Sequence, residues 1–334
     1  MQILKTNQQN VDLVPSSSSL DKQKINVAQA TIILNKLSRS WKNRAQVRRS
    51  MGENILFNEN AEDFLVDLLP FKDHPIFCNA SEDMKRKILS CGWIIYNQKT
   101  ITIETDIINP TCTNILSGII PGATNPVSKQ IICETMVDES YHVLLVTNAI
   151  ALTGQKRDIF LKLTLFNLVK NMKKYQEKRS SGWERILVQL ATAIVSEIFI
   201  SDYLKLLSEN EKIQLINRFT TKAHRDDELA HSNIFKNLTK CIYANLNRKE
   251  KEFFAEFLAK PVRWFADREL DVWQIALEQI GFKNAHNMIL DCKNFNSKCL
   301  MHIDYSVLVS LADELGITNM PKGQDSFYKE GLIN

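Results

Sequence analysis

Two five-residue stretches decide how this chain folds: Asp138-Glu139-Ser140-Tyr141-His142 and Asp227-Glu228-Leu229-Ala230-His231. Both have the pattern D-E-x-x-H, and both lie in segments whose apolar residues recur with helical spacing. Positions three apart share one face of an α-helix, so each glutamate points to the same side as the histidine that follows it. Two such faces, each joined by a glutamate from another helix, form a two-metal carboxylate site in the core of a helical bundle. One E-x-x-H is weak evidence, but two in matching settings are not.

Each motif has a suitable glutamate upstream. Glu197 lies inside the apolar segment Ile194–Ile200, and Glu104 is flanked by isoleucines. A buried carboxylate without a partner is very costly, and a metal ion removes that cost. The spacings to the two motifs also agree, since 139 − 104 = 35 and 228 − 197 = 31. The other upstream glutamates lie at helix starts, in a basic run, in polar connectors or on another helix face: Glu82, Glu134, Glu177, Glu184, Glu209 and Glu211.

His224 extends the second motif, because His224, Glu228 and His231 follow one helical stripe. We therefore expect a third nitrogen ligand. The predicted ligand set is Glu104, Glu139, His142, Glu197, His224, Glu228 and His231. Hard oxygen ligands with imidazole suit two iron ions, and manganese is the alternative metal. The alternative interpretation is a set of ordinary surface pairs, which leaves two glutamates in apolar helices without partners.

Four further residues are candidates for supporting roles. Asp138 and Asp227 precede the motif glutamates, where a carboxylate can accept the second ring N–H of a ligating histidine. The competing interpretation makes both ordinary surface residues. Tyr96 lies two turns before Glu104 on the same face, and Lys99 is close to the pocket that we expect there. A substrate-binding role for Tyr96 and Lys99 competes with a core aromatic and a surface lysine.

The fold class that these patterns predict is all-α, with a ferritin-like four-helix bundle core and extra helices at both ends. Only 10 glycines and 8 prolines interrupt the 334 residues, which favours long helices. The stretch Ile101–Thr105 is ambiguous because its β-branched residues favour a strand. We expect a helix to end at Asn109-Pro110. The expected helices cover residues 27–46, 60–69, 82–108, 127–152, 158–175, 183–207, 209–245, 248–259, 268–281, 284–293 and 304–315, with a short turn over 111–117.

The predicted domain organisation has three parts. Residues 1–27 are polar and serine-rich, which predicts a disordered tail. Residues 28–316 form a single all-helical domain with its bundle core at about 82–246, and residues 317–334 form a loose C-terminal tail. A basic run closes the first helix, at Arg39, Lys42, Arg44, Arg48 and Arg49. Such a run is usually a solvated face, and nucleic-acid or membrane contact is the less favoured interpretation.

Composition narrows the class of protein. The apolar content of 44%, the charged content of 24% and the net charge of +4 are those of a soluble globular protein without a strong case for nucleic acid. The seven cysteines are scattered and form no C-x-x-C, so we expect reduced thiols and a cytoplasmic protein. The most apolar segment, 186–207, carries Gln189, Glu197 and Asp202, and we expect a buried bundle helix there and no membrane partner.

At the seven ligand positions the chain resembles the di-iron N-oxygenases typified by p-aminobenzoate N-oxygenase (AurF). The shared pattern is Glu, Glu-x-x-His, Glu, His-x-x-x-Glu-x-x-His, over about residues 80–240. His224 is its most specific part, since ferritins and ribonucleotide reductase small subunits generally lack that histidine. The resemblance implies a di-iron enzyme that uses O2 to oxidise an amine nitrogen to a hydroxylamine, nitroso or nitro group, often in specialised metabolism. It also implies an external electron donor, because no flavin or nicotinamide motif occurs here.

Several points stay open at the level of sequence. The amine substrate is an arylamine, an amino acid or a carrier-bound amine, and a homodimer is one option for the assembly. A di-iron hydroxylase or oxidase acting at carbon is the main alternative function. A non-enzymatic iron-storing bundle and a metal-free interaction module are less favoured, the first because storage cages use shorter chains.

Overall fold

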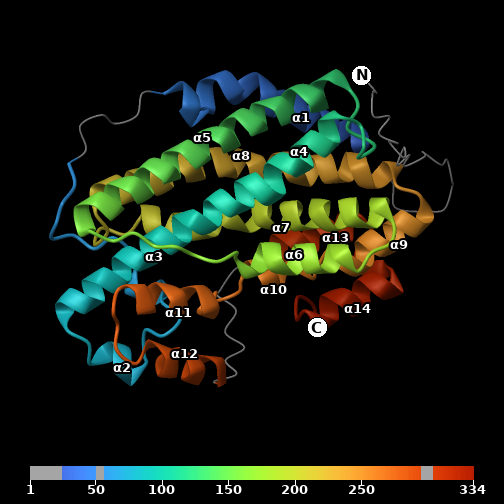
Figure 1. The fold of residues 1–334 in the computed structure, drawn as a ribbon. Coiled ribbons are helices and arrows are strands. Elements are labelled where there is room, and N and C mark those ends of the chain that lie inside the picture. Colours follow the sequence, from blue (N-terminus) through green and yellow to red (C-terminus); the bar gives the residue numbers. More distant parts are fainter. Residues whose placement is uncertain (1–24, 50–55, 295–303) are drawn as a thin grey trace, which may run out of the picture.

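Four long helices lie side by side and form the centre of the molecule (Figure 1). They are α3 (Glu82–Ile103), α5 (Pro126–Arg157), α7 (Gly182–Ser208) and α8 (Leu215–Asn245). The computed structural model describes residues 25–49, 56–294 and 304–334. Within these ranges the only strand-type pairing is one isolated parallel bridge between Glu62 and Ile213. The predicted all-α bundle is therefore confirmed.

The long helices begin where local side-chain chemistry favours it. Ser81 accepts a hydrogen bond from the Met84 N–H (3.3 Å) and so caps α3. Asn125 accepts from the Ser128 N–H (2.9 Å) ahead of α5, and Pro126 occupies the first turn, where its missing N–H costs nothing. Both caps satisfy amide groups that a helix start leaves without partners.

Helix α7 is buried on nearly all sides. It packs against α8, α6 (Asn167–Glu177), α9 (Arg248–Phe257) and α10 (Pro261–Phe265). Among the described residues α7 is the one helix long and apolar enough to span a membrane, but 72% of its most apolar window is buried inside the protein. Neighbouring helices therefore cover the apolar residues of α7, as predicted for a bundle helix.

The ambiguous stretch at Ile101–Thr105 is helical and contains a π-helical turn. Helix α3 passes into η3 (Glu104–Ile108), where the Asn109 N–H bonds to the Glu104 carbonyl five residues back. Helix α4 (Asn109–Leu116) follows directly. The expected end at Asn109-Pro110 is wrong, since Pro110 occupies the first turn of α4, where the wider π turn has already released the regular helical hydrogen bonding.

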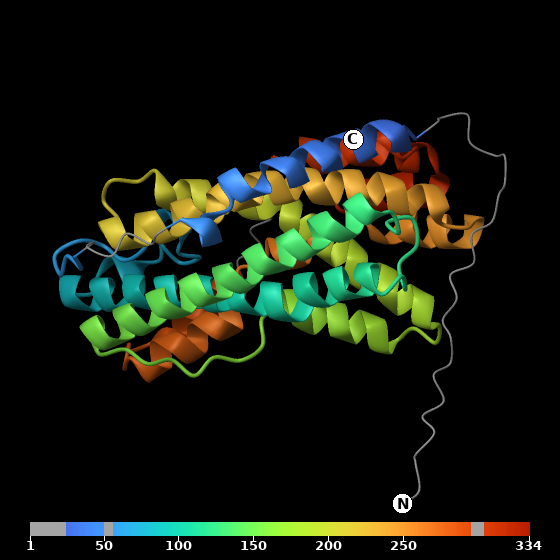
Figure 2. The same cartoon turned by 90° about the horizontal axis from the view of Figure 1, so that it is seen from above.

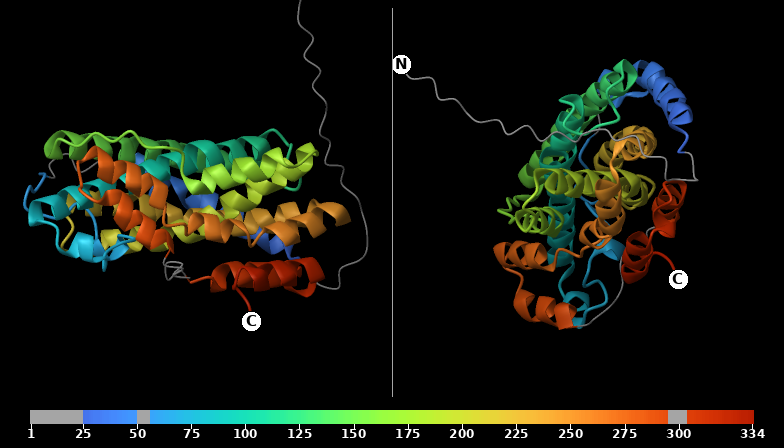
Figure 3. Two further views of the ribbon diagram at one scale, coloured as in Figure 1. Left: turned by 60° about the horizontal axis from the view of Figure 1, so that its bottom comes forward. Right: turned by 90° about the vertical axis from the view of Figure 1, so that its right-hand side faces the viewer.

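Helix α1 (Val27–Arg44) lies along α5 and α8, as the view from above and the end-on view show (Figures 2 and 3). Its buried face consists of Ala30, Leu34 and Ser38, and the Ser38 hydroxyl donates to Glu134 on α5 (3.0 Å). The short 3-10 turn η1 (Gln46–Arg48) continues this contact. The end of α1 is thereby placed directly over the middle of the bundle, beside the D-E-x-x-H motifs.

Two other predicted helices are wrong. Residues 60–69 contain only a 3-10 turn, η2 (Val66–Leu68), and α2 (Pro75–Cys78) follows. The helix expected from Asp158 begins at Asn167, because α5 runs on through Gly154 and ends where Asp158 adopts a left-handed backbone (φ 54°). Residues 159–166 are extended and alternate between buried and exposed side chains. Gln279 replaces the missing helical hydrogen bonds by pairing with both backbone groups of Lys162 (2.9 and 3.0 Å).

The C-terminal part adds further helices around the bundle, and the loose tail predicted after Gly316 is wrong. Helix α14 (Pro321–Lys329) packs against α9, where the Ser326 hydroxyl donates to the Glu256 carbonyl (2.7 Å) and Phe327 is fully buried. The remaining elements are α11 (Leu270–Gln279), α12 (Ala285–Asn294), α13 (Ser306–Glu314) and η4 (Ile317–Asn319). Most of the predicted disordered tail at 1–27 lies outside the described residues.

Candidate metal centre

The seven predicted ligands converge in the middle of the bundle. Helix α3 with its π turn supplies one residue, α5 two, α7 one and α8 three. All seven side chains are buried, with exposed fractions between 0% and 3%. Their ligand atoms fall into three overlapping groups in which every atom lies within 4.8 Å of the others. The members are Glu104, Glu139, His142, Glu197, His224, Glu228 and His231.

Glu139 lies between the histidines of the two motifs. Its carboxylate is 3.1 Å from Nδ1 of His142 and 2.8 Å from Nδ1 of His231. Glu197, from the opposite helix α7, brings its carboxylate to 3.9 Å from the same His231 nitrogen. Helix α5 is thereby joined to both α7 and α8 at one point in the core.

Glu228 occupies the corresponding position on α8. A single oxygen of this carboxylate, Oε1, is 3.0 Å from Nε2 of His224, 3.3 Å from Nδ1 of His142 and 3.5 Å from Nδ1 of His231. Glu104 closes the other side, at 3.7 Å from the same nitrogen of His224. A carboxylate between three imidazoles is placed to bridge two cations, and His224 adds the third nitrogen that the sequence predicted.

Carboxylate oxygens without partners show what this cluster needs. One oxygen each of Glu104, Glu139, Glu197 and Glu228 is fully buried and accepts no hydrogen bond, and Nδ1 of His231 likewise makes none. Such groups are strongly destabilising in a dry core. Metal cations satisfy all of them together, and the mixture of carboxylates with imidazoles suits a pair of iron or manganese ions. The residues present therefore fit a two-metal centre.

The electrostatics lead to the same conclusion. Burial, followed by the nearby carboxylate of Glu139, raises the pKa of Glu104 well above its usual range. Burial and the Glu228 carboxylate do the same to the pKa of Glu197. Burial also raises the pKa of Glu139, but the neighbouring imidazoles, His231 foremost, outweigh it and bring this pKa to about 2. The carboxylates repel one another, and bound cations remove that repulsion.

The two predicted supporting aspartates are buried behind the histidines. Oδ2 of Asp227 lies 3.3 Å from Nε2 of His142, and Oδ2 of Asp138 lies 3.2 Å from Nε2 of His231. An ionised carboxylate only accepts, so each histidine donates through Nε2 and keeps the Nδ1 lone pair facing the glutamates. The two motifs are thus linked reciprocally, because the aspartate of each motif orients the histidine of the other.

Helix α1 holds both aspartates in place, which sequence reasoning missed. The Trp41 indole N–H donates to both oxygens of Asp138 (2.9 and 3.0 Å), and the Gln46 backbone N–H contacts both oxygens of Asp227 (3.2 Å each). The Arg44 guanidinium lies between the two carboxylates, at 3.6 and 3.8 Å. The only sequence signal was the basic run at the end of this helix, which predicts a solvated face for Arg44.

Tyr96 and Lys99 have different surroundings. The Tyr96 hydroxyl is buried without a hydrogen-bond partner, and its pKa is raised by burial and by the nearby Tyr203 and Glu228. The Lys99 ammonium group instead contacts Glu269 (3.1 Å) and the Phe265 carbonyl oxygen (3.0 Å). These contacts tie α3 to the segment before α11 and give no support to a substrate role for Lys99.

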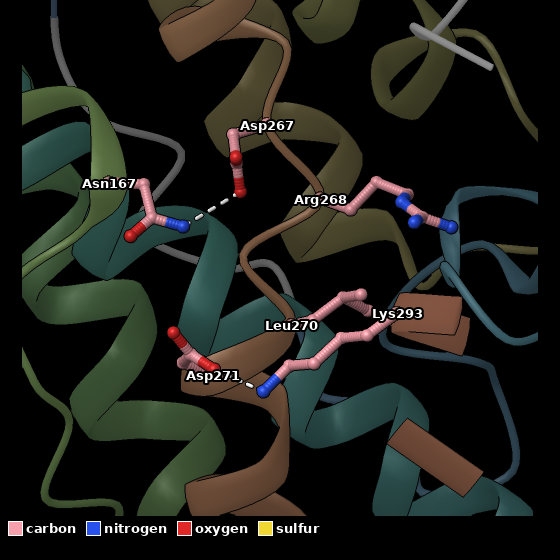
Figure 4. A pocket seen from close by; sticks show the side chains of 6 residues that line it. All are labelled: Asn167, Asp267, Arg268, Leu270, Asp271 and Lys293. Carbon is pink, nitrogen blue, oxygen red and sulfur yellow. Dashed lines mark hydrogen bonds and ion pairs between the residues drawn. The ribbon is translucent and has the colours of Figure 1, made fainter. Parts of the chain in front are cut away.

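A surface cleft between α6, α11 and α12 lies outside this centre (Figure 4). Its polar groups are engaged with one another: Asn167 donates to Asp267 (2.8 Å) and Lys293 pairs with Asp271 (2.5 Å). The Arg268 guanidinium donates to the Cys292 carbonyl (3.0 Å). These bonds connect the helices at a structural junction.

The fold and the buried cluster define a helical-bundle protein with a carboxylate-rich two-metal centre. The family described as P-aminobenzoate N-oxygenase AurF matches residues 28–316, and the chain belongs to this family. A 4-aminobenzoate N-oxygenase of Streptomyces thioluteus is 26% identical over 289 residues, which cover 85% of this chain and 86% of the relative. The protein is thus an oxidoreductase of the N-oxygenase class, and carbon oxidation, the alternative function, is not favoured.

Proposed function

We propose that this protein holds two iron ions in the buried centre and uses O2 to oxidise the amino nitrogen of an aromatic amine. The product is the hydroxylamine, the nitroso or the nitro compound. The amine class is supported by the relative named 4-aminobenzoate N-oxygenase. The oxygen and imidazole donors of the seven residues accept iron or manganese, and iron is favoured by the oxygen chemistry of the family.

The observation that carries the proposal is the position of His224. Its Nε2 lies 3.0 Å from Oε1 of Glu228 and 3.7 Å from Oε1 of Glu104, in a fully buried setting. His224 belongs to one group of candidate ligands, with Glu104, His142 and Glu228, and His231 belongs to another, with Glu139, His142 and Glu228. Such an extra nitrogen ligand makes the two metal positions chemically different.

The protein supplies positions and a dry environment for this chemistry. The seven residues would hold two irons, which would supply the activation of O2 needed for oxygen transfer to a nitrogen lone pair. Asp138 and Asp227 keep His231 and His142 in the tautomer whose Nδ1 lone pair faces the centre. The buried apolar residues of α7 on both sides of Glu197 exclude bulk water from that carboxylate. The side chains hold their geometry before the reaction begins, so little reorganisation accompanies it.

The atom balance of one oxidation step requires a reductant. An amine, one O2, two electrons and two protons give the hydroxylamine and one water molecule. O2 is the oxidant, and an external donor supplies the two electrons. We therefore propose an external electron donor as an obligatory partner.

Tyr96 is the residue that we assign to the substrate. Its hydroxyl is buried without a partner and lies close enough to Glu228 for that carboxylate to raise its pKa. A hydroxyl in this state gains a hydrogen bond when a polar group of the amine enters. Tyr96→Phe is expected to raise KM about fivefold to tenfold, the value of one hydrogen bond, with kcat largely retained.

The test begins with anaerobic loading of Fe(II), followed by O2 in the presence of 4-aminobenzoate. We expect about two irons per chain by elemental analysis, because the seven donors are arranged for two ions. An optical change on oxygen addition should accompany an N-oxygenated product detected by mass spectrometry. His224→Ala is expected to retain the fold and much of the metal but to change the oxygen reaction. Metal near zero in the loaded protein, or products oxidised only at carbon, would refute the proposal.

The setting of the enzyme is a separate part of the proposal. We expect a cytoplasmic protein in specialised metabolism, with a homodimer as one option for the assembly and no membrane or nucleic-acid partner. Cell fractionation and size-exclusion chromatography with light scattering test these expectations.

A further inference from the structure

A continuous line of contacts leads from the surface of α1 to the metal centre. The Trp41 indole N–H donates to Asp138, and Asp138 in turn contacts Nε2 of His231 at 3.2 Å. Nδ1 of the same imidazole faces Glu139 at 2.8 Å. Three consecutive short contacts therefore connect a partly exposed indole to a ligand of the centre, with no gap in the path.

The second aspartate lacks this connection. Asp227 supports His142 in the same way, but its partners are the backbone N–H of Gln46 in η1 and the Arg44 guanidinium of α1, neither of which is an aromatic ring. An indole places a conjugated ring in the path along which electrons tunnel, whereas an amide group does not. Orientation of the two histidines needs only a hydrogen-bond donor behind each aspartate, so orientation alone does not explain an indole at Asp138.

The surface around Trp41 has an apolar centre. A shallow groove beside it is lined by Val47, Met136, Val137, Ser140, Tyr141 and Leu144. Val137 and Leu144 are 44% and 52% exposed, which is high for apolar residues on a bundle helix. Along α5 the exposed residues of this stretch carry no charge, so the groove is a neutral patch directly above the D-E-x-x-H turn.

The segment that borders the groove is basic, and we call its exposed cations the basic rim: η1 supplies Val47 to the groove, and α1 packs along α5. The exposed cations of α1, η1 and the residue that follows are Lys36, Arg39, Lys42, Arg48 and Arg49. Between residues 22 and 52 the sequence contains no aspartate or glutamate. The Arg48 guanidinium also lies 5.8 Å from the centre of the Trp41 ring. An apolar patch with a rim of one charge sign fits a partner with the opposite sign around its own contact patch.

We propose that this surface docks an acidic one-electron carrier protein of the iron–sulfur or flavin class, and that electrons enter the centre through Trp41, Asp138 and His231. The inference rests on the proposed function, which requires two electrons per oxidation step. Two molecules of the reduced carrier each lose one electron, and these two electrons return the oxidised pair of metals to its reduced state. Trp41 passes the electrons on and is unchanged at the end of the cycle.

The first test separates electron transfer from positioning. Iron-loaded, oxidised protein is mixed anaerobically with a reduced acidic [2Fe–2S] ferredoxin, and reduction of the centre is followed by stopped-flow absorbance. Trp41→Phe removes the indole donor behind Asp138, and this loss of positioning slows reduction by any electron source alike, by about tenfold or more. Reduced methyl viologen, a small cation that the basic rim does not attract, measures that common effect. We expect the rate with ferredoxin to fall further than the rate with methyl viologen. Trp183→Phe is the matched control. Trp183 lies at the start of α7 and packs on Phe253.

The second test addresses the docking surface. The double variant Arg39→Glu, Lys42→Glu should lower the second-order rate with ferredoxin about tenfold and weaken its salt dependence, because the rim then repels the carrier. The control is Lys174→Glu, Lys178→Glu, which reverses two exposed charges at the end of α6.

Three results would overturn the proposal. They are an unchanged ferredoxin rate in Trp41→Phe, an equal slowing with ferredoxin and methyl viologen, and equal effects of the two double variants. Failure of the proposed function is a separate result, because it appears as absence of N-oxygenated product with methyl viologen as the electron source.

Discussion

Replacing Glu197 by methionine should stabilise the metal-free protein and remove most of the stability that metal loading adds. Glu197 lies on α7 and is 2% exposed, and its Oε2 accepts no hydrogen bond. Its carboxylate lies 3.9 Å from Nδ1 of His231 and close to the carboxylates of Glu104, Glu139 and Glu228. Without metal these crowded, buried carboxyl groups are a cost to the fold, and in the proposed centre Glu197 is a ligand.

The size of each effect follows from these contacts. Removing an unpartnered buried polar group, with an apolar side chain of similar volume in its place, should stabilise the metal-free protein by about 1–3 kcal/mol. For 334 residues the unfolding entropy is near 0.7 kcal/mol/K, so Tm should rise by roughly 2–4 °C. At a metal concentration of 100 Kd, binding adds about 2.7 kcal/mol to the wild type. Loss of a ligand that weakens binding about 100-fold leaves less than ~0.5 kcal/mol of that gain.

Differential scanning calorimetry on chelated and on anaerobically Fe(II)-loaded protein measures both quantities. Ser196→Ala is the control, because Ser196 is the buried neighbour that bonds only to the Thr192 carbonyl (3.0 Å). That variant should shift both forms in the same direction. A metal-free Glu197→Met protein that is less stable than the wild type would show that this carboxyl group is satisfied without metal, and the reasoning about the centre would be wrong.

Three further predictions test other parts of the structure. Asp138→Asn removes the negative charge and leaves one acceptor oxygen for both the His231 Nε2–H and the Trp41 indole N–H, so metal affinity measured by competition with a chelator should fall about 10–100-fold; an unchanged affinity contradicts the orienting role. Phe327→Ala should destabilise the protein by about 3–5 kcal/mol in urea unfolding, because Phe327 is fully buried, whereas a loose tail would give no change. Burial raises the pKa of Glu269 above 4.5 even though the Lys99 ammonium lowers it. The stability contributed by this raised pKa is full below pH 4.5 and is lost as the pH rises through the folded value, so the stability of the wild type relative to Glu269→Gln should decrease between pH 4.5 and pH 7. A difference that stays constant or increases over this range has the wrong sign.

The residues that converge in the buried cluster could be predicted because their geometry is local. Glu139 with His142, and Glu228 with His231, share a helix face by spacing alone. His224 follows from the same periodicity on α8. Glu104 and Glu197 were identified by a second physical rule, that a carboxylate in an apolar helix needs a partner. Both rules depend only on residues that are close together in the chain, so they can be applied before the tertiary structure is known.

The elements that the sequence predicted wrongly depend on contacts between residues that are far apart in the chain. The extended segment at 159–166 is rich in apolar residues that are compatible with a helix, but pairing of Lys162 with the distant Gln279 stabilises it as an extended strand-like connection. Helix α14 has few apolar residues, and its burial depends on α9, which lies far before it in the chain. Pro110 predicts a helix end, and the π turn at Glu104 removes the reason for one.

The sequence by itself determined that this is a helical protein with two ligand-bearing turns and two buried glutamates, because helical periodicity sets which side chains share a face. Only the tertiary structure decided which residues hold the two aspartates that orient the histidines. Trp41 and Asp138 are 97 residues apart in the chain, and Gln46 and Asp227 are 181 apart. Contacts over such distances depend on how α1 packs across α5 and α8, and packing angles and depths are set by the whole set of buried side chains rather than by any local pattern.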